Sequence, residues 1–209
     1  MVSELQSDFT ANAPKYLGKG THYADFLTFF QAEMDSKGWQ AVLTQYLFRD
    51  DGDPVAHDLF GRLYAGFLHP MIQLMFGVEW RQPAIMAEAL AQTAVHENKL
   101  GEFLTLAERR ADQKDPPYRP LVDLFEELGR GGEEHRKLVN SAHWDDPNRI
   151  YDGVMKRAPD EALEFVSGIK VRPEDLDERT AEMMHTAAYV AAAAAWHPPQ
   201  IPKFDFFLM

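Results

Sequence analysis

The chain has 209 residues, 45% of them hydrophobic, which is enough for one domain with its own core. Its 21 basic and 33 acidic residues give a formal net charge of −12, so we expect no nucleic-acid partner, because such a chain repels phosphate backbones. The lack of cysteine excludes disulfides and cysteine-ligated metal centres and fits a cytoplasmic protein.

The first half of the chain shows apolar residues at helical spacing. A helix is expected to begin after Thr21 and to carry "YADFLTFFQAEM", and another to carry "WQAVLTQYLF". Asp53 is a plausible N-cap, with Pro54 at the first helical position. Because proline cannot continue a helix, Pro70 is expected to kink or break this one.

A short joint and a second helix follow. Arg81–Gln82 forms the joint, and Pro83 is predicted to open a helix over 83–97. Since only a few residues connect this helix to the one over 54–79, the two should pack as an antiparallel hairpin.

The second half also has helical periodicity. "PYRPLVDLFEELG" is expected to end with Gly129 as its C-cap, and "RGGEEH" is the clearest loop. "DDPNRIYDGVMKRA" and "PDEALEFVSGI" each start with an acid–proline cue. A long final helix, "RPEDLDERTAEMMHTAAYVAAAAAW", is expected to stop at Pro198–Pro199.

These elements predict an all-α fold, a bundle-like array of antiparallel helical hairpins without a substantial sheet. We expect one domain over 1–209. The apolar end "IPKFDFFLM" indicates that the domain is part of a longer chain. The longest apolar run, near "AAYVAAAAAW", is too short to span a bilayer, so no membrane association is expected.

The predicted helix over 83–97 has an unusual distribution of polar residues. At 100° per residue, Glu88, Gln92 and His96 fall within roughly 80° of one another, and most other positions are apolar. This helix should therefore be buried, and its polar stripe should face either a strip of solvent or an internal cavity. A buried carboxylate and imidazole are costly unless they are paired or bind a metal, so such stripes often mark functional sites.

His69 is a second candidate of the same kind. It lies about as far before the joint as His96 lies after it, so the hairpin should bring the two imidazoles to the same level. Both histidines could instead be ordinary core residues. Glu79, near the joint, is expected to be structural.

Two other groupings carry weaker signals. Glu182 and His185 have the Glu-x-x-His spacing of di-iron bundles, but such sites need two copies and the sequence shows one. His57–Asp58 is an isolated "HD" dipeptide of the type found in metal-dependent phosphohydrolases. Chance readily supplies either motif, so a structural role is favoured for both.

The stretch "FLHPMIQLMFGVEWRQPAIMAEALAQTAVH" resembles the central motif of the questin oxidase-like family, and most of the chain shares this resemblance. The family holds mainly fungal and bacterial oxygenases that act on aromatic polyketides. The resemblance implies oxidative ring cleavage of the Baeyer–Villiger type, with NADPH implicated and a non-haem iron held largely by histidines. The expected partners are a small aromatic substrate and molecular oxygen.

Within this resemblance, His69 and His96 match the motif's histidines, and Glu79 and Glu88 match its carboxylates. His69 and His96 would be the metal ligands, and Glu88 a catalytic-site carboxylate that accepts a hydrogen bond from an imidazole. Many members have a further histidine where this chain has Gln73, and typical members are longer at both ends. The alternatives are a di-iron bundle built on Glu182 and His185, or a non-catalytic helical interaction domain.

Overall fold

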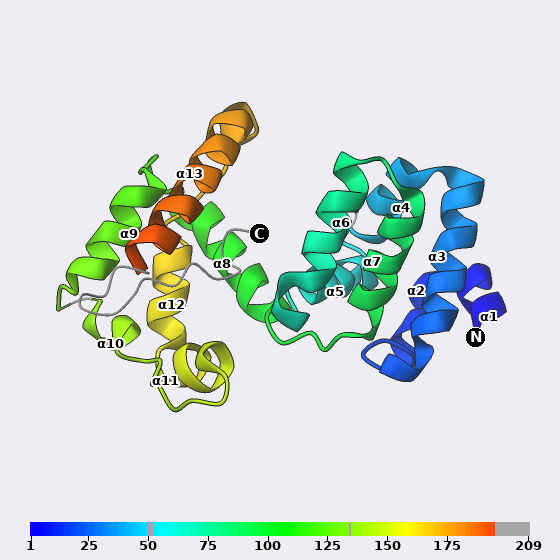
Figure 1. Ribbon diagram of the computed structural model, residues 1–209, viewed down its shortest axis with the longest axis horizontal. Coiled ribbons are helices and arrows are strands. Elements are labelled where there is room, and N and C mark those ends of the chain that lie inside the picture. The colour runs from blue at the N-terminus through cyan, green and yellow to red at the C-terminus, as the bar shows by residue number, and fades with distance from the viewer. Residues whose placement is uncertain (50–51, 134, 195–209) are drawn as a thin grey trace. The chain divides into compact units, whose positions relative to one another are not determined.

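The computed structural model describes residues 1–49, 52–133 and 135–194, and these residues form helices and no strand (Figure 1). The predicted all-α fold class is therefore confirmed. No helix of this described part is long and apolar enough to cross a membrane.

The chain divides into two compact units, Met1–Leu104 and Thr105–Met209. The expectation of one domain over 1–209 stays a prediction. The first unit contains α1 (Val2–Ser7), α2 (Phe9–Asn12), α3 (Tyr23–Lys37), α4 (Trp39–Tyr46), α5 (Pro54–Arg62), α6 (His69–Glu79) and α7 (Pro83–Val95). Helix α8 (Gly101–Lys114) begins in the first unit and ends in the second.

The second unit continues with further helices, most of them short. These are α9 (Leu121–Arg130), α10 (Arg136–Val139), α11 (Met155–Arg157), α12 (Pro159–Val166) and α13 (Leu176–Ala194). A π-helical segment, Arg149–Val154, leads directly into α11. The expected stop of the last helix at Pro198–Pro199 lies outside the described residues.

Several helix boundaries follow from local chemistry. The Asp53 carboxylate accepts hydrogen bonds from the backbone N–H groups of Val55 and Ala56, so it caps α5 as predicted. Pro83 occupies the first position of α7, also as predicted. The chain breaks before Pro70: α5 ends at Arg62, and α6 begins at His69. Pro70 therefore lies in the first turn of α6, where a proline is tolerated.

The prediction for the end of α9 was wrong by two residues. Gly131, with φ +64°, is the C-cap in place of Gly129, because Gly131 is the glycine that adopts the left-handed conformation in which helices commonly end. Helices α1, α2 and α8 were not predicted.

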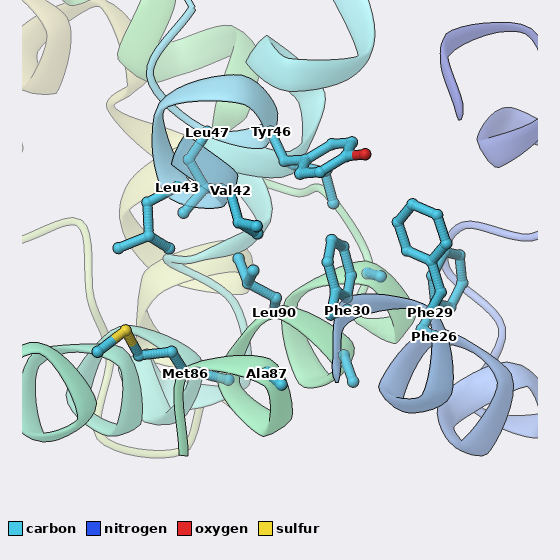
Figure 2. Packing of buried hydrophobic residues seen from close by; sticks show 14 of the residues in the cluster. Phe26, Phe29, Phe30, Val42, Leu43, Tyr46, Leu47, Met86, Ala87 and Leu90 are labelled. Carbon is cyan, nitrogen blue, oxygen red and sulfur yellow. The ribbon is translucent and has the colours of Figure 1, made fainter. Parts of the chain in front are cut away.

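Helix α7 packs against α3 and α6 and is central to the core of the first unit. Met86, Ala87, Leu90, Ala91 and Ala94 have no measurable solvent exposure, which agrees with the predicted burial of this helix. Figure 2 shows side chains of α3 and α4, including Phe30 and Val42, gathered around Leu90. The polar stripe of α7 lies beside α6, because Gln73 of α6 is hydrogen-bonded to both Glu88 and Gln92.

Candidate functional site

Helices α6 and α7 form the predicted antiparallel hairpin, joined through Arg81 and Gln82 (Figure 1). In this register, residues at similar distances from the joint face each other. Gln73 and Gln92 demonstrate it, since the side-chain amide of Gln92 donates a hydrogen bond to Gln73 Oε1. His69 and His96 lie one turn further from the joint, so the same register places them opposite one another.

Gly66 is the residue at which the two histidines meet. His69 Nδ1 lies 2.7 Å from the backbone carbonyl oxygen of Gly66. A Cβ placed on Gly66 would also lie 2.6 Å from both Cε1 and Nε2 of His96. These contacts place the ring nitrogens, His69 Nδ1 and His96 Nε2, within roughly 9 Å of each other, given standard backbone dimensions.

The contact with Gly66 also sets the tautomer of His69. A carbonyl oxygen can only accept a hydrogen bond, so His69 Nδ1 carries the proton and donates it. In the neutral form of the imidazole, Nε2 then keeps its lone pair. This arrangement, with one ring nitrogen donating to a backbone carbonyl and the other left as a ligand atom, is typical of metal-binding histidines.

The backbone before His69 has an unusual conformation. Phe67 and Leu68 both have positive φ values, 61° and 65°, which non-glycine residues rarely adopt. Gly66, with φ +54°, begins this turn. Such strain persists only where the surrounding structure enforces it, and it occurs often at functional sites. Here it turns the chain sharply into α6 and leaves the His69 side chain exposed.

Glu88 joins the site through the two glutamines. Gln73 Nε2 donates a hydrogen bond of 2.8 Å to Glu88 Oε2, while Gln73 Oε1 accepts the bond from Gln92. The half-buried carboxylate is therefore paired. Burial, and secondly the charge of Glu88, raise the pKa of Tyr23 on α3 above its usual value. Glu88 was expected to accept a hydrogen bond from an imidazole. For His69, the backbone carbonyl of Gly66 is the acceptor instead.

The expected metal ligands can be compared with this geometry. His69 and His96 both lie against Gly66, and the hydrogen bond to its carbonyl engages Nδ1 of His69 rather than Nε2. Within residues 1–49, 52–133 and 135–194, no group of three or more His, Asp or Glu side chains is placed to hold a metal ion. The metal site expected on His69 and His96 stays a prediction.

The remaining candidates have structural roles. Glu182 accepts a hydrogen bond from the Leu121 N–H at the start of α9 and forms an ion pair with Arg179, whereas His185 is exposed. Glu182 thus fixes the packing of α13 on α9, which disfavours the di-iron alternative. Glu79 is exposed at the end of α6.

A separate polar cavity of about 270 Å³ lies among α1, α3 and α4. The charged side chains that line this cavity are largely paired with one another. Tyr46 donates a hydrogen bond of 2.5 Å to Glu33, which also pairs with Lys37. Burial, followed by this hydrogen bond, raises the pKa of Tyr46. With its charges satisfied in this way, the cavity is a weaker candidate than the histidine pair.

Comparison with known proteins decides the relationship. The sequence profile of the family described as "Questin oxidase-like" matches residues 3–209. The chain belongs to the questin oxidase-like family.

Named relatives from fungi agree with this membership. The Baeyer–Villiger oxidase notM of an Aspergillus species is 41% identical over 168 residues, covering 80% of this chain and 40% of the relative. Oxidoreductase AflY of Aspergillus parasiticus is 38% identical, and the match covers 92% of this chain and 38% of the relative. Questin oxidase of Aspergillus fumigatus is 36% identical, and the match covers 91% of this chain and 43% of the relative. This questin oxidase-like chain therefore spans about two-fifths of the length of these curated relatives.

The sequence alone does not reveal every residue of the site. Gly66 and Arg62 carry no chemical motif, and their importance comes from contacts with His96, far along the chain. Gln73 stands in the sequence only as the residue that occupies the place of a histidine in the family motif. The structure shows that its amide bridges Glu88 and Gln92.

Proposed function

We propose that this chain is part of an oxygenase that acts on an aromatic, polyketide-type substrate by oxidative ring cleavage of the Baeyer–Villiger kind. The support comes from family membership and from relatives whose names are Baeyer–Villiger oxidase and questin oxidase. Molecular oxygen is the proposed co-substrate and NADPH the proposed reductant. A cytoplasmic location belongs to the same proposal.

The observation that carries the proposal is the meeting of His69 and His96 at Gly66. In this proposal the two imidazoles ligate one non-haem iron ion, with His69 binding through Nε2. The iron, when bound, would supply the position at which oxygen is activated. The Gly66 carbonyl holds the Nδ1 proton of His69 and so keeps the ring in the ligating tautomer.

The proposed role of Glu88 follows from its hydrogen bonds. Gln73, one helical turn from His69, donates a hydrogen bond to Glu88 and accepts one from Gln92, so the carboxylate belongs to the α6–α7 interface. Its proposed role is to hold these two glutamines in place beside the histidines. In this proposal Glu88 also remains a catalytic-site carboxylate.

Metal affinity provides the decisive experiment. Fe(II) binding is measured under anaerobic conditions for the wild-type chain and for His69→Ala, His96→Ala and Gln92→Ala. Each histidine variant should weaken affinity at least about tenfold, because each removes a ligand. Gln92→Ala, the matched control on the same stripe, should have a much smaller effect. Unchanged affinity in both histidine variants would rule out this ligand pair.

Catalysis requires a separate measurement. Oxygen consumption with an anthraquinone and NADPH should depend on bound iron and on both histidines. Iron binding without such turnover would support the metal site and contradict the proposed activity for this length of chain.

A further inference from the structure

The backbone of His96 is held by a cluster on α5 and the loop after α7 that contains none of the proposed ligands. The members of this cluster, called here the α5 clamp, are Asp58, Arg62 and Asn98. Arg62 donates a hydrogen bond from Nη1 to the backbone carbonyl of His96. The side chain of Arg62 is 12% exposed, so this bond is largely shielded from water.

Asp58 orients the guanidinium group. Its Oδ2 atom accepts from Arg62 Nε at 2.6 Å, one helical turn along α5. Its Oδ1 atom accepts from Asn98 Nδ2 at 2.7 Å. One carboxylate therefore connects Arg62, which binds His96, to Asn98, two residues further along the same loop.

Asn98 completes the connection to α8. Its Oδ1 atom accepts a hydrogen bond of 2.8 Å from the Gly101 N–H, at the first residue of that helix. A Cβ on Gly61 of α5 would lie 2.7 Å from Gly101 Cα and 2.8 Å from Asn98 Oδ1. The loop after α7 can approach α5 this closely because residue 61 is glycine.

These contacts fix His96 at the place where its geometry is least determined by the helix. Helix α7 ends at Val95, and His96 has an extended conformation, with ψ 158°. Its N–H bonds to the carbonyls of Gln92 and Thr93, and its carbonyl bonds to Arg62. With both backbone groups held, the Cα–Cβ direction is set, and the imidazole points at Gly66.

We infer that Asp58, Arg62 and Asn98 are positioning residues that aim the His96 imidazole at His69 across Gly66. Only the reason for positioning His96, which is metal binding, rests on the proposed function. The hydrogen bonds of the clamp do not depend on a metal. It also gives the isolated His57–Asp58 motif a role, in which Asp58 supports His96 and does not bind a metal itself.

The test uses Asp58→Asn, which keeps the side-chain shape and removes the charge that orients Arg62. Asp35→Asn is the matched control, because it makes the same substitution at an exposed position of α3, outside the clamp. Arg62→Lys is a second variant that retains a positive charge but loses the forked contact with Asp58 and His96.

The first readout is the imidazole ¹⁵N spectrum of metal-free, histidine-labelled protein. Asp58→Asn and Arg62→Lys should shift or broaden the His96 signals, while His143 in the second unit serves as an internal reference. Asp35→Asn should give the wild-type spectrum. His96 signals identical to wild type in either folded variant of the clamp would overturn the inference.

The second readout is Co(II) affinity measured by calorimetry. Affinity should fall about tenfold in Asp58→Asn and Arg62→Lys, as is usual when a residue supporting a ligand is lost, and should be unchanged in Asp35→Asn. If the wild-type chain binds no Co(II), the proposed metal site fails, and the imidazole spectra alone still decide whether the clamp positions His96. Wild-type affinity in both clamp variants would contradict the positioning role.

Discussion

Gly66 meets two separate requirements that no other residue type satisfies together. Its φ of +54° is unfavourable for residues with a side chain, and the His96 ring occupies the space that a Cβ would need. At the same time its carbonyl fixes the proton of His69. One small residue thereby couples the orientation of both histidines.

Gly66→Ala should therefore cost about 1–3 kcal/mol of unfolding free energy, because the added methyl group must displace the His96 ring from a strained backbone position. Urea denaturation measures the loss. Gly20→Ala is the control, since a Cβ added to Gly20 would meet no atom within 4 Å and its φ is not positive. A loss below about 0.5 kcal/mol in Gly66→Ala would show that the ring can move aside freely.

At this scale, the assignment of His69, His96 and Glu88 to a functional site stays a prediction. The similar distances of His69 and His96 from the joint indicated that the hairpin would bring them to the same level, and both lie against Gly66. The contact with Gly66 and the hydrogen bond from Arg62 could not be predicted, because both depend on how the loop after α7 folds back. A glycine that makes room for a distant side chain leaves no local pattern.

At the scale of elements, α7 is the central helix of the hydrophobic core of the first unit. It is rich in alanine, which favours close packing, and it lies in the core beside α3 and α6. Its polar residues face α6, where Gln73 pairs with Glu88 and Gln92. The helix thus contributes to the core on one side and to the candidate site on another.

Leu90→Asp should lower the unfolding free energy by about 3–5 kcal/mol, because it places an unpaired charge where the wild-type side chain has no exposure. Denaturant titration followed by circular dichroism gives the value. Ala84→Asp introduces the same group at an exposed position in the first turn of α7 and should change stability by less than about 0.5 kcal/mol. A loss of less than about 1 kcal/mol for Leu90→Asp would contradict the central position of α7.

Helix starts were easier to predict than helix ends. The starts of α5 and α7 depend on local residues: Asp53 caps α5 ahead of Pro54, and Pro83 opens α7. These helix starts can therefore be recognised from the sequence alone. The end of α7 depends on more distant groups: His96 leaves the helix and is held by Arg62, although the pattern predicted helix through residue 97. The end of α9 at Gly131 similarly depended on which of three nearby glycines met the left-handed position.

At the scale of the whole molecule, the buried apolar residues are unevenly distributed. The main hydrophobic cluster lies entirely within the first unit and includes Phe26, Phe29 and Phe30. Among the described residues of the second unit, the buried hydrophobic side chains are Ala107, Ala111, Leu124, Ala158, Ala162 and Leu163, most of them small. Less apolar area is therefore removed from water per residue there.

Hydrogen exchange should reveal this difference. Backbone amides of α3 and α7 should exchange roughly tenfold or more slowly than those of α9 and α12, because local opening costs less where few large side chains are buried. Mass spectrometry of peptic fragments measures the rates. Equal protection of α7 and α12 would show that stability is spread evenly through the chain.

The facing arrangement of α6 and α7 has a consequence for how this protein can change during evolution. Inserting one residue within α7 would rotate everything beyond it by about 100°, turning His96 away from Gly66. The same insertion at Arg81–Gln82 would only lengthen the connection. Homologous genes that retain the histidine pair should therefore vary in length at that joint and keep a constant length from the joint to each histidine.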